Sequence, residues 1–176
     1  HYFNYNNSKA RKSLILKLLC LTLLASLPVT ILAQNVIYVS PNGDDGFPGT
    51  RPDTAKQTVN GAISAASAGD ILVLEEGTYT GNVKVDKRVT IAGAGIGQTI
   101  IDGQITCNAP VSGTDEMVLK QMSVSDGGNA ITVETGYLRV EDLSASNNGN
   151  SAEGIVFPNL TSKRSISNVV VKRCFF

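Results

Sequence analysis

Four charged residues in the second half of the chain have types and a spacing that could support catalysis: Lys120, Arg139, Glu141 and Asp142. Paired carboxylates can serve as a general acid and a general base, and a lysine beside them can take up a proton. Glu141 follows Lys120 by 21 residues and precedes Lys172 by 31, so a repeat would bring all three onto one outward ladder. The structural alternative is that opposite charges in such a ladder stabilise an exposed sheet by roughly a few tenths of a kcal/mol.

Histidine chemistry is excluded from almost the whole chain. The 176 residues contain one histidine, His1, so Ser-His-Asp triads, Cys-His dyads and histidine-ligated zinc have no place after the N-terminal segment. Four of the 15 basic residues and none of the 15 acidic residues precede Gln34, which leaves 11 against 15 in residues 34–176, a net charge near −4. An acidic body disfavours nucleic acid or an anionic membrane as the partner.

The turn at Asn42–Gly46 offers a candidate cation site. Asp44 and Asp45 lie on this turn, and carboxylate oxygens are ligands that Ca²⁺ prefers. The alternative is a solvated turn in which Asp and Asn bond to their own backbone. No other cofactor is predicted.

The cysteines show no spacing typical of a metal site. Cys107 and Cys174 both lie in apolar, strand-like segments. Export from the cell would permit a disulfide between them, whereas their apolar surroundings favour buried free thiols, and the sequence leaves both states open.

Residues 1–33 have the layout of a secretory signal peptide. A basic segment precedes an apolar run of 16 residues, Leu18 to Ala33. This run is shorter than the roughly 20 residues of a membrane-spanning helix and contains Pro28, so a membrane anchor is the weaker alternative. We expect a secreted, extracellular or cell-surface protein that begins near Gln34 and has no membrane span after signal cleavage.

One amphipathic helix is expected, over residues 55–68. Thr54 and Gln57 form a capping-box pattern at its start, and Gly69 stands where a left-handed C-terminal cap belongs. Its narrow apolar stripe is typical of a helix that lies on another surface. The stripe consists of Val59, Ala62, Ile63 and Ala66. We assign residues 34–69 to an N-terminal cap.

Short strands and a sequence repeat follow the helix. The first expected strands are 71–74, 82–85, 89–92 and 99–101. The pattern of residues 119–125 recurs at 140–146 and again at 171–176, and turns rich in Gly and Asn follow the first two copies. Second strands are expected after these turns, at 130–133 and 154–157.

A period of about 20 residues with two or three short strands per unit is typical of the coils of a parallel β-helix. One such coil cannot bury its inward face, so the fold needs several stacked coils and a cap. We assign residues 70–176 to the first coils. Because the chain starts at His1 instead of Met and stops within the apolar segment Val169–Phe176, we expect both ends to be cut.

Several segments resemble a known family. These are IYVSPNGDDGFPGT at 37–50, AGDILVLEEGTY at 68–79, VTIAG at 89–93 and TIIDG at 99–103. They resemble the N-terminal region of secreted right-handed parallel β-helix proteins of the pectin-lyase-like superfamily. The resemblance covers Val36–Gly103, and it implies an all-β, right-handed parallel β-helix (a solenoid) with an N-terminal capping α-helix.

The resemblance implies an extracellular role but no single activity. Polysaccharide lyases of this fold use a Lys or Arg base with Ca²⁺, glycoside hydrolases use carboxylates, and other members have no known catalysis. We therefore expect a β-helix protein that binds or processes polysaccharide, with its enzymatic status open. If it is an enzyme, we expect a polysaccharide lyase or glycoside hydrolase that acts on an acidic glycan, with its catalytic coils beyond Phe176. The alternative is a non-catalytic extracellular adhesin or structural surface protein. The full-length protein is expected to be a monomer.

Overall fold

The computed structural model describes residues 34–109, 116–126, 129–135, 137–147, 154–156 and 170–172, and the expected signal peptide lies outside them. The described residues are predominantly β, with parallel sheets and one α-helix. The helical elements are η1 (Pro52–Thr54) and α2 (Val59–Ala65). The strands are β1 (Val36–Val39), β2 (Ile71–Leu74), β3 (Gly77–Thr80), β4 (Val83–Val85), β5 (Thr90–Ala92), β6 (Thr99–Asp102), β7 (Ile105–Asn108), β8 (Met117–Asp126), β9 (Ile131–Thr135), β10 (Leu138–Asn147), β11 (Ile155–Val156) and β12 (Val170–Lys172).

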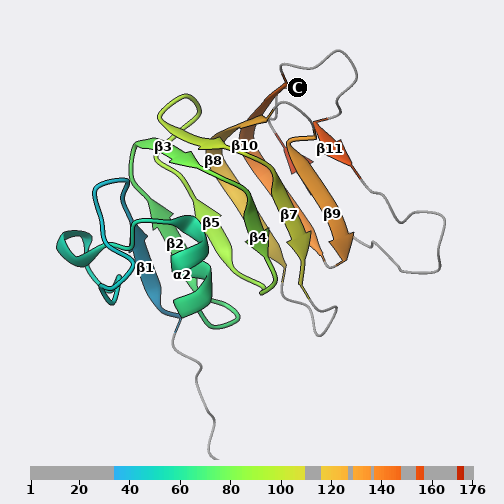
Figure 1. Ribbon diagram of the computed structural model, residues 1–176. Coiled ribbons are helices and arrows are strands. Elements are labelled where there is room, and N and C mark those ends of the chain that lie inside the picture. Colours follow the sequence, from blue (N-terminus) through green and yellow to red (C-terminus); the bar gives the residue numbers. More distant parts are fainter. Residues whose placement is uncertain are drawn as a thin grey trace, which may run out of the picture. The chain divides into compact units, whose positions relative to one another are not determined.

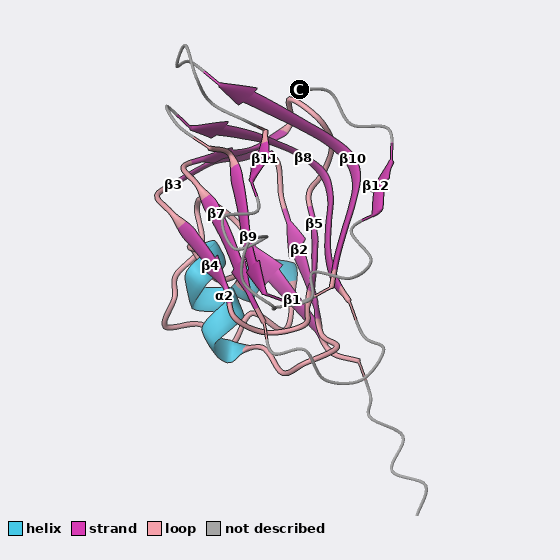
Figure 2. Ribbon diagram, turned by 90° about the vertical axis from the view of Figure 1, so that its right-hand side faces the viewer, coloured by secondary structure: helices cyan, strands magenta, loops and turns pink. Residues whose placement is uncertain are grey.

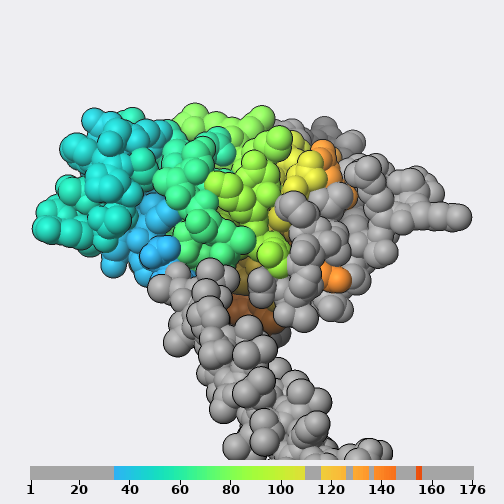
Figure 3. Space-filling view, turned by 90° about the horizontal axis from the view of Figure 1, so that it is seen from below, coloured from blue at the N-terminus to red at the C-terminus, as the bar shows by residue number. Residues whose placement is uncertain are grey.

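The strands form two parallel sheets (Figure 1). Sheet A has the order β1-β2-β5-β8-β10-β12. Strand β6 also pairs with the second half of β8, and β3 pairs with β6. Sheet B has the order β11-β9-β7-β4, and Figure 2 shows it facing sheet A. The chain passes through β2, β3 and β4 and then returns, so that β5 pairs with β2, β6 with β3 and β7 with β4. This course is consistent with a β-helix-like solenoid. In Figure 3 the colours of the surface run in chain order from one end of the sheets toward the other.

The strand register confirms the sequence repeat. Leu119 of β8 pairs with Val140 of β10, and Val140 pairs in turn with Val171 of β12. Lys120, Glu141 and Lys172 are therefore aligned on neighbouring strands, as the 21- and 31-residue spacings predict.

Strands β8 and β10 each turn a corner at one residue in the left-handed conformation. The angle φ is 58° at Gln121 and 49° at Asp142. The left-handed residue interrupts the alternation of a straight strand, so that Leu119 and Met122 are both buried while Gln121 is exposed. Gly93 lies against the same corner, because a Cβ atom on it would collide with the carbonyl oxygen of Gln121. The corner therefore requires glycine at position 93.

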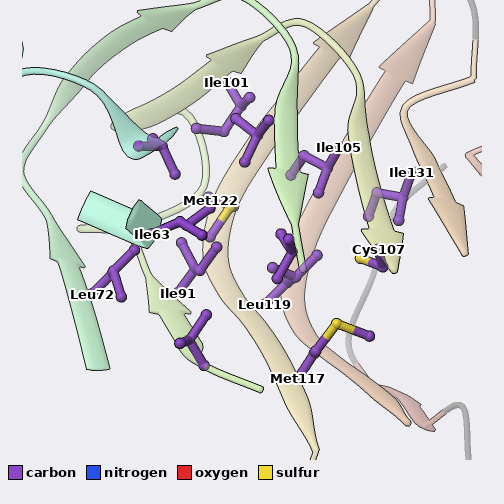
Figure 4. Packing of buried hydrophobic residues seen from close by; sticks show 14 of the residues in the cluster. Ile63, Leu72, Ile91, Ile101, Ile105, Cys107, Met117, Leu119, Met122 and Ile131 are labelled. Atoms are coloured by element: carbon purple, nitrogen blue, oxygen red, sulfur yellow. The ribbon is translucent and has the colours of Figure 1, made fainter. Parts of the chain in front are cut away.

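Apolar side chains from successive strands stack into one core (Figure 4). Leu72, Ile91, Leu119 and Val140 follow one another in register, and each is at most 1% exposed. Ile105 and Ile131 continue the stacking in sheet B. Because burial of each such side chain contributes about 1.5–3 kcal/mol, a slip in register would be costly.

Tyr79 ties the first strands of the core together. Its side chain is 6% exposed, and its hydroxyl donates to the carbonyl oxygen of Val39 at 2.9 Å. A second contact joins the same hydroxyl to the carbonyl oxygen of Glu75 at 3.2 Å. Burial and the charge of Glu75 raise the pKa of the phenol, so Tyr79 serves as a neutral structural residue.

The helix starts later than the sequence predicts. The expected start at Ala55 is wrong, because Thr54 ends η1 and Lys56 forms a parallel bridge with Val39. Thr58 is the N-cap of α2, and its hydroxyl accepts from the N–H of Gly61 at 2.9 Å. The Thr54–Gln57 capping box is wrong for the same reason.

The helix also ends earlier than predicted. Ala66 is its C-cap, whereas Gly69 lies beyond it and donates its N–H to Arg88 at 2.7 Å. Gly69 does have a positive φ of 95°, but it serves the start of β2 and not the helix. The apolar stripe is confirmed, since Val59, Ala62, Ile63 and Ala66 are all buried. Helix α2 packs with β1, β2 and β4.

Most expected strands are present with ends shifted by a few residues. Residues 71–74 form β2 as predicted, whereas the repeat segments extend to Met117–Asp126 and Leu138–Asn147. Strand β3 was not predicted, since Gly77 at its start is a weak strand former, and β7 was anticipated only as the strand-like segment around Cys107. No helix among the described residues is long and apolar enough to cross a membrane.

Candidate functional site

Three of the four predicted site residues line one groove on the outer face of sheet A. Lys120 comes from β8, and Arg139 and Glu141 come from β10. The groove has a volume of about 500 Å³, and its lining also includes Arg88, Thr90, Glu116 and Val118. We call it the charged groove.

Strand register explains why these side chains meet. Thr90, Val118 and Arg139 are aligned across β5, β8 and β10. Lys120 and Glu141 are aligned two residues further along β8 and β10, with buried Leu119 and Val140 between the two outward rows. The alternation of a strand therefore places both rows on the outside while the residues between them fill the core.

The centre of the groove is an arginine between two carboxylates. Nε of Arg139 donates to Oε2 of Glu116 at 2.7 Å, and Nη1 lies 3.7 Å from Oε1 of Glu141. The three side chains are only partly exposed, at 38% for Arg139, 21% for Glu116 and 24% for Glu141. The hydrogen bond and charge of Glu116, followed by the charge of Glu141, raise the pKa of Arg139.

Lys120 differs from Arg139 in its contacts. Its Cα is aligned with Glu141, but within the described parts of the chain its ammonium group makes no hydrogen bond or ion pair. The charged groove thus holds a fixed network around Arg139 and one cation that remains available for a ligand. Its charged lining consists of Arg88, Lys120, Arg139, Glu116 and Glu141, one more cation than anions.

The fourth predicted site residue, Asp142, does not line the groove. Asp142 follows Glu141 at the left-handed corner of β10. The backbone of Lys172 pairs with that of Glu141 on the neighbouring strand.

Glu116 and Arg88 line the groove but were not predicted as site residues. Glu116 precedes the first copy of the repeat, and the backbone pairing that starts with Met117 and Leu138 brings it next to Arg139. Extending the repeat by a few residues toward the N-terminus would have revealed Glu116. Arg88 belongs to an earlier strand connection without repeat pattern, so only the fold places it there.

The carboxylates of the candidate cation site bond within the protein. Oδ1 of Asp44 accepts from the N–H of Gly46 at 2.7 Å. This is the hydrogen bond to the backbone of the turn that was expected for a solvated turn without a cation. Oδ1 of Asp45 accepts from the N–H groups of Gln57 and Thr58 at 2.9 Å, and Oδ2 accepts from the Thr58 hydroxyl at 2.6 Å. Among the described residues no group of three or more His, Cys, Asp or Glu could hold a metal ion.

These bonds determine the ionisation of Asp45. Partial burial raises the pKa of its carboxyl group, but the hydrogen bonds from Thr58 and Gln57 and the charge of Lys56 outweigh burial. The net result is a pKa below the ordinary value, because folding favours the charged form. Asp45 therefore fixes the turn against the start of α2.

Cys107 is a buried free thiol, one of the two states left open by the sequence. It is 0% exposed, and burial raises its pKa to about 12. Cys174 lies outside the described residues.

A scan against protein-family models and a search of curated proteins find no match to this chain.

Proposed function

We propose that this chain is an extracellular right-handed parallel β-helix protein of the pectin-lyase-like type, and that its charged groove binds an acidic polysaccharide. The observation that carries the proposal is the available ammonium group of Lys120 in a groove whose two carboxylates, Glu116 and Glu141, are already paired with Arg139. A carboxylate of the glycan would accept from Lys120, and the hydroxyl of Thr90 would bond to the sugar hydroxyls.

The arrangement of charges favours binding over catalysis in this groove. A glycosidase needs space for a sugar between its two carboxyl groups. Here the guanidinium of Arg139 lies within 2.7 Å of Glu116 and 3.7 Å of Glu141, so it occupies that space. A rigid network of this kind can orient a ligand without taking part in its chemistry.

Local charge also supports an acidic ligand. Residues 34–176 carry a net charge near −4, whereas the charged lining of the groove has one more cation than anions. An anionic chain would therefore meet less repulsion here than over the body as a whole, and binding should weaken as salt rises.

The test is calorimetric titration of the chain with tetragalacturonate, using neutral cellotetraose as the control ligand. We expect Lys120→Ala to weaken binding of the acidic ligand about tenfold, the cost of one charge-assisted contact. Lys84→Ala is the matched control, because Lys84 is exposed on β4 and does not line the groove. Absence of binding, or equal affinity in the Lys120→Ala variant, would refute the proposal.

The same samples separate binding from turnover. Formation of unsaturated uronate or of new reducing ends, lost in Glu141→Gln, would show that this groove is an enzyme site. Binding with neither product is the result that we expect.

A further inference from the structure

A second hollow lies between the segment that leads into α2 and the strands β3 and β4. It has a volume of about 230 Å³ and shares no lining residue with the charged groove. Its polar lining is formed by Gln57, Thr58, Asn60, Thr78 and Thr80, and the half-buried Pro41 contributes apolar surface. We call this hollow the cap cleft.

Two of the polar residues are held rigidly by the protein. The side chain of Asn60 donates to the carbonyl oxygen of Asn82 at 2.8 Å and accepts from the N–H of Lys84 at 3.1 Å. The hydroxyl of Thr58 donates to Asp45 and accepts from the N–H of Gly61. These bonds tie α2 to β4 and to the preceding turn, so one wall of the cleft is preformed.

Three other side chains remain available. Thr78 and Thr80 are exposed on β3 and flank the buried Tyr79, and Gln57 is exposed in the connection before α2. Within the described ranges their side chains form no hydrogen bond or ion pair. A hydroxyl or an amide group can both donate and accept, which suits a ligand that does the same.

We infer that the cap cleft binds one neutral, hydroxyl-rich sugar unit. No charged side chain lines the cleft, so an ionised group there would lose hydration without gaining a partner of opposite charge. The half-buried Pro41 offers an apolar surface for the C–H face of a sugar ring, and the hydroxyl and amide groups of the same lining can bond to its hydroxyls. The volume is below the roughly 300 Å³ of typical pockets for drug-sized ligands, so the cleft suits one ring.

This inference does not depend on the charged groove. A neutral sugar unit and an acidic chain would bind at separate places, and either site can fail while the other holds. If both bind, the cleft would engage an uncharged residue or branch of a glycan.

The experiment is NMR titration of the ¹⁵N-labelled chain with methyl glycosides of glucose, galactose, mannose and xylose, and with methyl galacturonoside as the charged comparison. We expect at least one neutral glycoside to shift the amide signals of Gln57, Thr80 and Gly81, with a Kd on the order of 1 mM. The charged glycoside should leave these signals unchanged.

Variants locate the binding groups. Thr78→Val and Thr80→Val each replace an exposed hydroxyl by a methyl group of the same shape, and each should weaken binding about fivefold, the value of one hydrogen bond. Thr106→Val is the matched control, a half-buried threonine on β7 outside the cleft. Gln57→Ala tests whether the amide group of Gln57, which lies outside any strand, also binds the sugar.

Two results would overturn the inference. One is the absence of shifts at the cleft amides with every neutral glycoside. The other is unchanged affinity in Thr78→Val, Thr80→Val and Gln57→Ala when the amide spectra show that these variants are folded. Titration of the same variants with tetragalacturonate reports separately on the charged groove.

Discussion

The ammonium group of Lys87 lies 2.8 Å from the carbonyl oxygen of Ala66, the residue that caps the end of α2. The same group donates to the carbonyl oxygens of Ile63 at 2.8 Å and Ser64 at 3.2 Å. One side chain just before β5 thus binds three carbonyl oxygens at the C-terminal end of α2, where a positive charge also interacts favourably with the helix dipole.

Replacing Lys87 should therefore destabilise the fold. Lys87→Met keeps the aliphatic stem and removes three charge-assisted hydrogen bonds, and we expect the free energy of unfolding to fall by about 1–3 kcal/mol. Urea denaturation followed by circular dichroism measures the change. Lys84→Met, on the exposed face of β4, should be nearly neutral, and equal effects of the two substitutions would contradict the capping role.

Asp45 should make stability depend on pH in acid. Its pKa is lower in the folded protein than its ordinary value of 3.8, so its contribution is complete above the unfolded value and disappears as pH falls through the folded value. Asp45→Asn should cost about 1 kcal/mol near neutral pH, a modest value because the carboxylate is exposed to solvent. The difference from the parent chain should shrink as the pH falls through the lowered pKa of Asp45.

Asp53→Asn is the control for this measurement. Asp53 pairs with Arg51, but the two side chains are 62% and 71% exposed, so the pair should contribute little. A cost for Asp45→Asn that persists unchanged in acid would show that ionisation is not its cause.

A substitution at the corner residue Gln121 should increase the stability of the fold. Its φ of 58° is strained for glutamine, whereas asparagine adopts this region more readily. We expect Gln121→Asn to raise the free energy of unfolding by up to about 1 kcal/mol. Gly93→Ala should act in the opposite direction, because its Cβ would collide with the backbone of Gln121. Thermal unfolding of both variants checks the pair, and a loss of stability in Gln121→Asn would count against the strain.

Cys107 should resist alkylation in the folded protein. The thiol is fully buried and its pKa is raised to about 12, so almost no reactive thiolate exists at mildly alkaline pH. Iodoacetamide followed by peptide mass spectrometry should find Cys107 unmodified without denaturant and modified in urea. Rapid modification of the folded chain would mean that this part of sheet B opens easily.

Local pattern was sufficient for much of the fold. The apolar alternation of residues 71–74 and the repeat at 119–125 and 140–146 predict strands and the register between them. The stripe of α2 was also readable, because burial of Val59, Ala62 and Ile63 follows helical periodicity. Alignment of Lys120 with Glu141 follows from the same repeat.

Contacts between distant residues decided the rest. The helix starts at Val59 because the carboxylate of Asp45 binds Gln57 and Thr58, a contact across a dozen residues that no capping pattern contains. Glu116 reaches Arg139 because parallel pairing aligns β8 with β10, and Arg88 joins them from an earlier connection.

Sequence by itself determined which residues face inward on each strand, because the side-chain alternation is a local property of the backbone. Only the tertiary structure decided which outward charges become neighbours, since that depends on strand pairing and on where each corner falls. The left-handed residues Gln121 and Asp142 show why: one backbone angle at each corner reorients every side chain that follows it.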